Sequence, residues 1–363
     1  MKVKLGDVAS FSKGAQINGD ELMPDGEYSF LNGGIYPSGK WSAYNVCGRT
    51  ITISEGGNSS GYVNYMKQPF WCGAHCYYLF DLKCDSKYLF YALKSQQERI
   101  MQLRSGACMP NIRKSDLARF ELDIDPDISN QKTVVQILDR ITRLIALREK
   151  QLAKLDEVVK ARFVEMFGDL NINPMGWEFQ KLSSLCDVRD GTHDSPEYQN
   201  EGYPLLTSKN FSSGIIDFSD CNLICEEDFE MINRRSKVDY GDIIMPMIGT
   251  IGHPVIVDID RPFAIKNVAL IKFNNKEISN NFVKTVLDSD YFLNVTTANS
   301  RGGTQKFIAL GDIRNIPIPI VPKELQIEFA DFAKEVERQK LTIQQSLDKM
   351  EVLKRSLMQE YFG

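Results

Sequence analysis

The nearest approach to a metal-binding motif in the sequence is Cys72-Gly-Ala-His75-Cys76, with Cys47 and Cys84 not far away. Zinc sites usually combine two short ligand spacings of this kind. The alternation of apolar residues from Trp71 to Phe80 is instead typical of a buried strand, in which cysteine behaves as a small core residue. We therefore predict no bound metal, and reduced thiols for the eight cysteines of the chain.

Motifs for other chemistry are absent from the sequence. The loop Gly-x-x-x-x-Gly-Lys-Ser/Thr, which holds nucleotide phosphates, does not occur. The methyltransferase motif Asp/Asn-Pro-Pro-Tyr/Phe is also missing, because Asn173-Pro174-Met175-Gly176 departs from it at the third position. The histidines, His75, His193 and His253, accompany no nucleophile–base pattern. The sequence thus predicts a chain with no catalytic residues and no cofactor of its own.

Two long helices organise the rest of the chain. From Val134 to Met166, apolar or long side chains recur at alternating steps of four and three, the period of a helix that buries one seam against another helix. The same pattern returns 195 residues later, from Phe329 to Tyr361. The apolar part of the seam consists of Leu138, Ile141, Ile145, Leu152, Leu155 and Val159 in the first helix, and of Val336, Ile343, Leu347, Met350 and Leu357 in the second.

The segments that precede the helices repeat as well. The apolar pattern from Leu5 to Gly14 returns from Leu182 to Gly191, an offset of 177 residues, and Pro69-Phe70 returns as Pro262-Phe263, an offset of 193. The offset grows only inside loops, where insertions cost little. The sequence therefore predicts globular domains at residues 1–125 and 171–322, each followed by a long helix, at 126–170 and 323–363.

Basic residues interrupt both seams, at Arg148 and Arg162 in the first and at Lys340 and Lys354 in the second. An antiparallel pairing about a pseudo-twofold axis would bury the apolar residues together and let the basic side chains reach out of the seam. In the alternatives, each helix packs on its own domain or mediates homodimerisation. We expect an α+β fold with two mixed α/β domains separated by two long antiparallel coiled-coil helices.

Local patterns predict elements within the first domain. Thr50–Ser54 and Phe70–Leu82 are expected as strand, residues 86–103 have helical spacing, and residues 117–124 are expected as a last strand.

The composition is that of an ordinary globular protein. No apolar run approaches the roughly 20 residues of a membrane span, and the first ten residues lack a signal-peptide pattern, so we expect a cytoplasmic protein. The net charge is −5, and no segment is basic enough to bind DNA phosphates without regard to sequence. If the chain binds nucleic acid, its basic groups must gather on one face, or a partner must supply much of the phosphate binding.

Several strings in the sequence resemble the specificity subunit (HsdS) of type I restriction-modification systems. In the second half they are Arg189-Asp-Gly-Thr-His193-Asp-Ser-Pro196, Leu206-Thr-Ser-Lys-Asn210, Met247-Ile-Gly-Thr250-Ile-Gly252 and Ile265-Lys-Asn-Val-Ala269. In the first half they are Ser12-Lys13-Gly14, Ile53–Gly61 and Pro110-Asn-Ile112. The ordered set, on top of the internal repeat, covers essentially the whole chain.

The resemblance implies a DNA-reading protein without catalysis of its own. Each domain would be a target recognition domain that reads one half of a bipartite, asymmetric sequence in double-stranded DNA. The helix pair would set the spacer and dock two methyltransferase (HsdM) subunits, forming an adenine-N6 methyltransferase. Two motor-nuclease (HsdR) subunits would complete an ATP-dependent endonuclease, so S-adenosylmethionine, ATP and Mg would belong to the partners. A structural coiled-coil scaffold, or a stand-alone methyltransferase or nuclease, are the alternatives.

Base readout and phosphate positioning need amides, hydroxyls, cations and the backbone amides of glycine-rich turns. Loops of both domains combine these groups, although such loops can also merely turn the chain. The DNA-binding residues that we expect are Lys13, Asn32, Tyr36, Ser54, Asn58, Ser59, Ser60, Arg104, Asn111, Arg113, Thr192, His193, Ser208, Lys209, Asn210, Thr250, Lys266, Asn267, Arg301, Thr304, Gln305 and Lys306.

Overall fold

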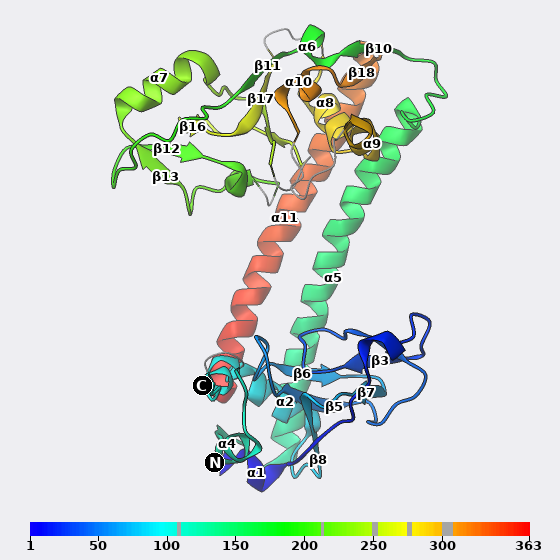
Figure 1. Cartoon of the computed structure of the whole chain (residues 1–363), viewed down its shortest axis with the longest axis vertical. Coiled ribbons are helices and arrows are strands. Elements are labelled where there is room, and N and C mark those ends of the chain that lie inside the picture. The colour runs from blue at the N-terminus through cyan, green and yellow to red at the C-terminus, as the bar shows by residue number, and fades with distance from the viewer. Residues whose placement is uncertain (107–109, 212–213, 249–252, 274–277, 300–307) are drawn as a thin grey trace. The chain divides into compact units, whose positions relative to one another are not determined.

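The computed structural model describes residues 1–106, 110–211, 214–248, 253–273, 278–299 and 308–363. The chain forms two compact units. Unit 1 comprises Met1–Lys150 and Gln344–Gly363, and unit 2 comprises Gln151–Ile343. Two helices of 40 residues, α5 (Ile128–Phe167) and α11 (Lys323–Phe362), each contribute to both units (Figure 1).

Unit 1 is built on a main sheet with the strand order β2-β8-β5-β6, in which neighbours are antiparallel. A second sheet has the order β4-β3-β7, with β3 and β7 parallel, and β1 pairs with β9. The strands are β1 (Lys2–Lys4), β2 (Ser10–Lys13), β3 (Tyr28–Leu31), β4 (Gly39–Trp41), β5 (Thr50–Ser54), β6 (Val63–Met66), β7 (Phe70–Cys72), β8 (Cys76–Phe80) and β9 (Glu121–Asp123). The short helices are α1 (Leu5–Val8), η1 (Gly19–Glu21), α2 (Ser86–Ser95), α3 (Gln97–Met101) and α4 (Lys114–Arg119).

Unit 2 repeats this topology. Its main sheet has the order β11-β17-β14-β15, its second sheet the order β13-β12-β16 with β12 and β16 parallel, and β10 pairs with β18. The strands are β10 (Glu178–Lys181), β11 (Asp187–Asp190), β12 (Tyr203–Leu206), β13 (Asn222–Ile224), β14 (Ile243–Pro246), β15 (Val255–Ile256), β16 (Ala264–Ile265), β17 (Val268–Lys272) and β18 (Pro317–Ile320). The helices are α6 (Leu182–Leu185), η2 (Ser208–Phe211), α7 (Glu226–Ser236), α8 (Asn280–Leu287), α9 (Asp290–Asn299) and α10 (Leu310–Arg314). The predicted internal repeat is therefore confirmed.

Two glycines occupy equivalent places in the repeat. A Cβ on Gly14 would lie 1.7 Å from the Cys72 carbonyl oxygen, and one on Gly191 would lie 2.4 Å from that of Ile265. The next residue in each unit donates its backbone N–H to the same carbonyl, at 3.0 Å in both cases. Only glycine allows this close approach between the end of one sheet strand and the second sheet.

Two local predictions for unit 1 are correct in type but each segment is divided, and a third prediction is wrong in part. Residues 70–82 form two strands rather than one, because the chain turns at Gly73 and the N–H of Cys76 bonds back to the Gly73 carbonyl. The helical segment expected over residues 86–103 is divided into α2 and α3 at Gln96, whose φ of −99° and ψ of 20° are not helical. The Gln96 side chain donates a hydrogen bond to the Phe362 carbonyl. Residues 117–124 contain the end of α4 before β9, because the spacing of Leu117 and Phe120 is helical.

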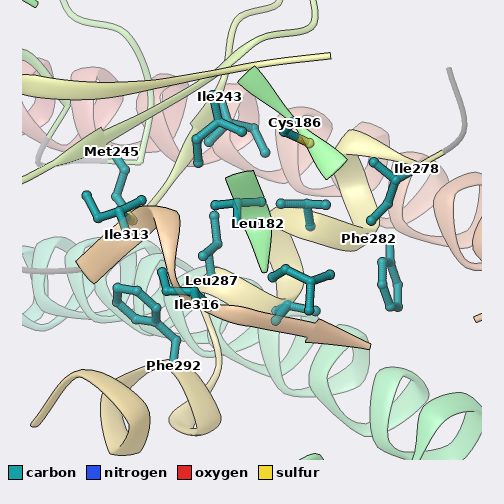
Figure 2. Close-up of a cluster of buried hydrophobic side chains, with 14 of the residues drawn as sticks. Leu182, Cys186, Ile243, Met245, Ile278, Phe282, Leu287, Phe292, Ile313 and Ile316 are labelled. Atoms are coloured by element: carbon teal, nitrogen blue, oxygen red, sulfur yellow. The ribbon is translucent and has the colours of Figure 1, made fainter. Parts of the chain in front are cut away.

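The core of unit 2 encloses the ends of both long helices. Phe163 and Phe167 of α5 lie 5.5 and 5.6 Å from Phe329 of α11, measured between ring centroids, and both rings also contact Phe282 of α8. Figure 2 shows the neighbouring part of this core, where labelled side chains such as Leu182, Ile243 and Phe282 come from helices and strands of the same unit.

Within unit 2 the two long helices run antiparallel. Arg162 of α5 pairs with Glu328 of α11 at 2.6 Å, and Asp156, further back on α5, pairs with Lys340, further along α11, at 2.9 Å. Two of the basic seam residues, Arg162 and Lys340, thus reach carboxylates at the edge of the seam. In both units, each seam position from Val134 to Met166 and from Phe329 to Tyr361 is buried or half-buried.

A buried glutamine joins each long helix to its domain. In unit 1, Gln131 accepts a hydrogen bond from the Asp85 N–H at 2.8 Å and donates to the Asp125 carbonyl at 2.6 Å. In unit 2, Gln326 does the same with Ser279 and Val321, at 2.8 and 3.0 Å. These two glutamines also stand 195 residues apart, so the repeat extends to a polar contact in the core.

Replacing Gln131 with alanine should destabilise unit 1 by about 2 kcal/mol, because a half-buried N–H and a half-buried carbonyl lose their buried partner. Gln136, exposed one and a half turns further along α5, is the matched control, and its replacement should cost less than about 0.5 kcal/mol. Urea unfolding followed by the fluorescence of Trp41 and Trp71, both in unit 1, measures the two effects. Equal losses in both variants would contradict the bridging role.

Candidate nucleic-acid interface

The polar loops of each unit gather at one edge of the main sheet. In unit 1, β2 and β5 are both antiparallel to β8, so their last residues, Lys13 and Ser54, lie at the same edge, next to the start of β8. In unit 2, β11 and β14 are both antiparallel to β17, so their last residues, Asp190 and Pro246, also lie at one edge, next to the start of β17. The sheet topology thus brings together loops that are far apart in the sequence.

Hydrogen bonds join the loops of unit 1 to one another. The Gly33 carbonyl accepts from the hydroxyls of Ser54 at 2.5 Å and Ser59 at 2.6 Å, and the Asn32 side chain accepts from the His75 N–H at 3.1 Å. These contacts fix the loops but occupy the side chains that make them. The hydroxyl of Ser60 is likewise bonded to the Glu55 carbonyl. Ser54 and Ser60 are buried, so neither side chain is presented at the surface.

A second group of predicted residues in unit 1 is presented at the surface. Arg104 is exposed and its guanidinium donates to the carbonyls of Met101 at 2.6 Å and Asn58 at 3.5 Å. Asn111 and Arg113 are exposed, and the Pro110 carbonyl accepts from Gly57 at 3.0 Å, which ties this segment to the loop after β5. The remaining predicted residues on this surface are Asn58 and Tyr36, both exposed.

The Glu55 cluster, made of Glu55, Lys13, His75 and Tyr77, lies beneath this surface. Glu55 is 6% exposed and pairs with the Lys13 ammonium, while the Tyr77 hydroxyl donates to it at 3.2 Å. His75 Nδ1 lies 3.9 Å from the second carboxylate oxygen. Burial, and then the Glu55 charge, raise the pKa of Tyr77 to about 12. The cluster therefore holds one exposed cation over one buried acid.

Unit 2 has an equivalent arrangement, the Asp190 cluster of Asp190, His193, Arg235 and Asn267. Asp190 is 6% exposed and pairs with the Arg235 guanidinium through one oxygen. Its other oxygen lies 2.8 Å from Nε2 of His193, whose Nδ1 lies 2.8 Å from the side-chain oxygen of Asn267. These hydrogen bonds, chiefly the one with Asn267, raise the pKa of His193. Asp190 and Lys13 occupy equivalent strand ends, so unit 2 has an acid where unit 1 has a base.

The loop after β12 is braced internally. Asn210 is buried, and its amide accepts from the Thr207 N–H at 2.9 Å and donates to the carbonyls of Asp217 and Asp220. This side chain holds the loop and is not presented at the surface. Lys209 is exposed and pairs with Asp220 at 2.9 Å, beside the half-buried Ser208.

Thr192 and Lys266 flank the Asp190 cluster. The Thr192 hydroxyl accepts from the Asp194 N–H at 3.1 Å, and the Lys266 ammonium donates to the Ser195 hydroxyl at 2.5 Å. Five predicted residues lie outside the described part of the chain, namely Thr250, Arg301, Thr304, Gln305 and Lys306.

The sequence did not single out Glu55, Asp190, Tyr77 or Arg235. Glu55 and Asp190 do stand inside the strings Ile53–Gly61 and Arg189–Pro196, but as acids they do not fit the pattern of DNA contacts. No sequence pattern pointed to Arg235, because it lies at the end of α7, 45 residues after Asp190.

The described residues contain no group of three or more histidine, cysteine or acidic side chains placed to hold a metal ion. None of the helices in that part of the chain is both long enough and apolar enough to span a membrane.

Two units of one topology, each with polar loops gathered at the same sheet edge, define a duplicated binding protein. A sequence profile of the family described as type I restriction modification DNA specificity domain matches residues 1–157 and 174–352. The chain belongs to this family.

Similar proteins carry related names. A Mycoplasma pneumoniae protein named type I specificity subunit S.MpnORF638P is 38% identical over 160 residues, which cover 43% of this chain and 41% of that protein. The type I restriction enzyme MjaVIII specificity subunit of Methanocaldococcus jannaschii is 25% identical over 272 residues, 70% of this chain and 64% of the relative. Each match spans less than two thirds of the relative's length.

A solved structure shares the fold. The type I restriction-modification S subunit from M. genitalium superposes with a TM-score of 0.68 at 21% identity, covering 100% of this chain and 96% of that chain. A structure from work on complex assembly and conformational transition of the type I R-M system gives a TM-score of 0.53 at 14% identity, covering 99% and 96%.

Proposed function

We propose that this chain is the DNA sequence-specificity subunit of a type I restriction-modification complex. The observation that carries the proposal is the duplicated unit, in which both copies match one DNA-specificity family and both gather polar loops at the same sheet edge. Each unit would read one half of a bipartite target, through the exposed Arg104 and Arg113 in unit 1 and through the exposed Lys209 and the half-buried Lys266 in unit 2.

Catalysis would belong to other subunits. The chain would dock two methyltransferase subunits along its long helices to form an adenine-N6 methyltransferase, and two motor-nuclease subunits would add ATP-dependent cleavage. S-adenosylmethionine, ATP and Mg would be bound by those partners. The net charge of −5 supports this division of labour, because the chain alone lacks the excess of cations that strong phosphate binding requires.

An exchange of recognition domains tests the proposal. Replacing residues 1–125 with the first domain of another family member should change one half of the methylated sequence and keep the other half. Sequencing of N6-methyladenine in the host genome measures this, and exchanging residues 171–322 is the reciprocal control. An unchanged methylated sequence in both exchanges would instead indicate a structural scaffold.

A further inference from the structure

His193 is held at both ring nitrogens by oxygen atoms. Nε2 lies 2.8 Å from a carboxylate oxygen of Asp190, and Nδ1 lies 2.8 Å from the side-chain oxygen of Asn267. A carboxylate and an amide oxygen can only accept, so both ring nitrogens must donate. With the Asn267 oxygen toward Nδ1, the arrangement fits the doubly protonated, cationic imidazole.

The neutral ring does not fit the same contacts. Its one remaining N–H would stay on Nε2 to serve the buried Asp190 carboxylate, which leaves a lone pair on Nδ1 facing the Asn267 oxygen. Rotating the Asn267 amide by half a turn removes this repulsion, because its NH₂ group then donates to Nδ1. Loss of a proton from His193 thus exchanges the oxygen and the NH₂ group of Asn267.

The backbone of Asn267 does not follow that rotation. Its φ is +55°, and its N–H donates to the Thr192 carbonyl at 3.1 Å. The neighbouring Lys266 is fixed through Ser195. The rotation therefore changes only which polar group of the half-buried Asn267 amide points away from the His193 ring. This amide lies at the sheet edge where the loops of unit 2 gather.

The charged groups around His193 favour the cation. Asp190 on β11 faces Nε2, and Arg235 at the end of α7 opposes it while pairing with the same carboxylate. The nearby loops add Asp194 and the Ser195-bound Lys266. The hydrogen bonds with Asn267 and then Asp190 have a larger effect than burial and the Arg235 charge, and they raise the pKa of His193 above its ordinary value of 6.5. The cation is thus the major form at and below pH 6.5 and is lost as the pH rises through the raised value.

We propose that the protonation state of His193 sets which group of Asn267 faces DNA, so that the base preference of unit 2 changes with pH. This inference rests on the proposed DNA-reading function. With His193 charged, Asn267 presents its NH₂ donor, which suits the acceptors of guanine and thymine and the N7 of adenine, but not cytosine. With His193 neutral, it presents its oxygen, which suits the amino groups of adenine and cytosine. His193 acts here as a positioning residue and Asn267 as the contacting one.

Unit 1 provides an internal control. His75 Nδ1 lies 3.9 Å from Glu55, beyond hydrogen-bonding distance, so His75 is not held between two acceptors as His193 is. The half-site read by unit 1 should therefore keep its base preference over the same pH range.

The test is a selection from randomised duplex DNA by the full chain, assembled with its methyltransferase subunits, at pH 6.0 and pH 8.5. At one position of one half-site, the ratio of guanine or thymine to cytosine should change by about fivefold, which is the effect of one hydrogen bond. His193→Gln should abolish this change, whereas the matched variant His75→Gln should retain it. Identical preferences at both pH values, or a change that survives in His193→Gln, would overturn the inference.

A measurement without DNA separates this inference from the proposed function. In NMR spectra of the full chain, the side-chain amide signals of Asn267 should shift with the same midpoint as the ring nitrogens of His193, and His193→Gln should remove the shift. If the amide signals stay constant while His193 titrates, the coupling does not exist. If the coupling is present but no DNA sequence is selected at either pH, the proposed function fails and the coupling stands.

Discussion

Replacing Phe167 with alanine should lower the free energy of unfolding of unit 2 by about 4 kcal/mol. The side chain is fully buried, and its ring centroid lies 4.9 Å from those of Phe163 and Phe282 and 5.6 Å from that of Phe329. Removing the ring opens a cavity between α5, α8 and α11 that these bulky neighbours cannot close. Urea unfolding followed at Trp177, the tryptophan of unit 2, measures the loss once Trp41 and Trp71 are replaced by phenylalanine.

Phe362 is the matched position in unit 1. It is 5% exposed and its ring lies 5.1 Å from that of Tyr88, with Tyr361 as its other close ring, so it has fewer aromatic neighbours than Phe167. Phe362→Ala should therefore leave the transition of Trp177 unchanged, and Phe167→Leu should cost only about 1 kcal/mol. A loss for Phe167→Ala no larger than for Phe167→Leu would show that this core is not closely packed.

Asp242→Ala should destabilise unit 2 by about 3 kcal/mol, because it removes a partner from a buried ammonium group. Lys272 is 5% exposed, and its Nζ lies 2.7 Å from Asp242, 2.8 Å from Asp239 and 2.9 Å from the Lys237 carbonyl. This loss of stability is at the lower end of the range for a broken buried ion pair, because Asp239 and the Lys237 carbonyl still contact the Lys272 ammonium. Unfolding followed at Trp177 again provides the measurement.

Two variants control this prediction. Asp239→Ala removes the more exposed partner and should cost less than about 1 kcal/mol. Lys272→Met combined with Asp242→Ala should recover most of the loss, because no charge then stays buried. The bond with Lys272 lowers the pKa of Asp239, so its contribution is complete above pH 3.8 and disappears as the pH falls through the folded value. If the double variant is as unstable as Asp242→Ala, the buried charge is not the cause.

The repeat and the helix seam could be predicted because they follow periodic patterns. A seam that recurs every three or four residues, and an apolar pattern that returns after 177 residues, are properties of the sequence itself. The turn inside residues 70–82 was missed because apolar residues on both sides of Gly73 mimic one continuous strand. The helical turn at Leu117 was missed because the strand-like alternation of Phe120, Leu122 and Ile124 was extended back to Leu117, whose spacing of three from Phe120 is helical.

The chemistry of the candidate site was less predictable. Asn210 has the side chain of a base-reading residue, but whether an amide faces outward or holds its own loop depends on contacts with residues up to ten positions away. The Asp190 cluster is formed by residues up to 77 positions apart, and no spacing rule connects Asp190 with Arg235 or Asn267. Electrostatic partners of this kind are set by the tertiary fold.

The buried cysteines give each unit its own reporter of transient opening. Cys72 and Cys76 are at most 1% exposed in unit 1, and Cys186 is 6% exposed in unit 2. The hydrogen bond with Cys76, and then burial, raise the pKa of the Cys72 thiol. Burial raises the pKa of the Cys186 thiol to about 12. Neither thiol therefore reacts as a thiolate while its unit is closed. The rate of alkylation at these buried cysteines therefore reports how often each core opens. The rate at the exposed Cys47 gives the reaction rate of a cysteine that needs no opening. A single labelling time course on the unmodified chain can rank the two halves by how often they open.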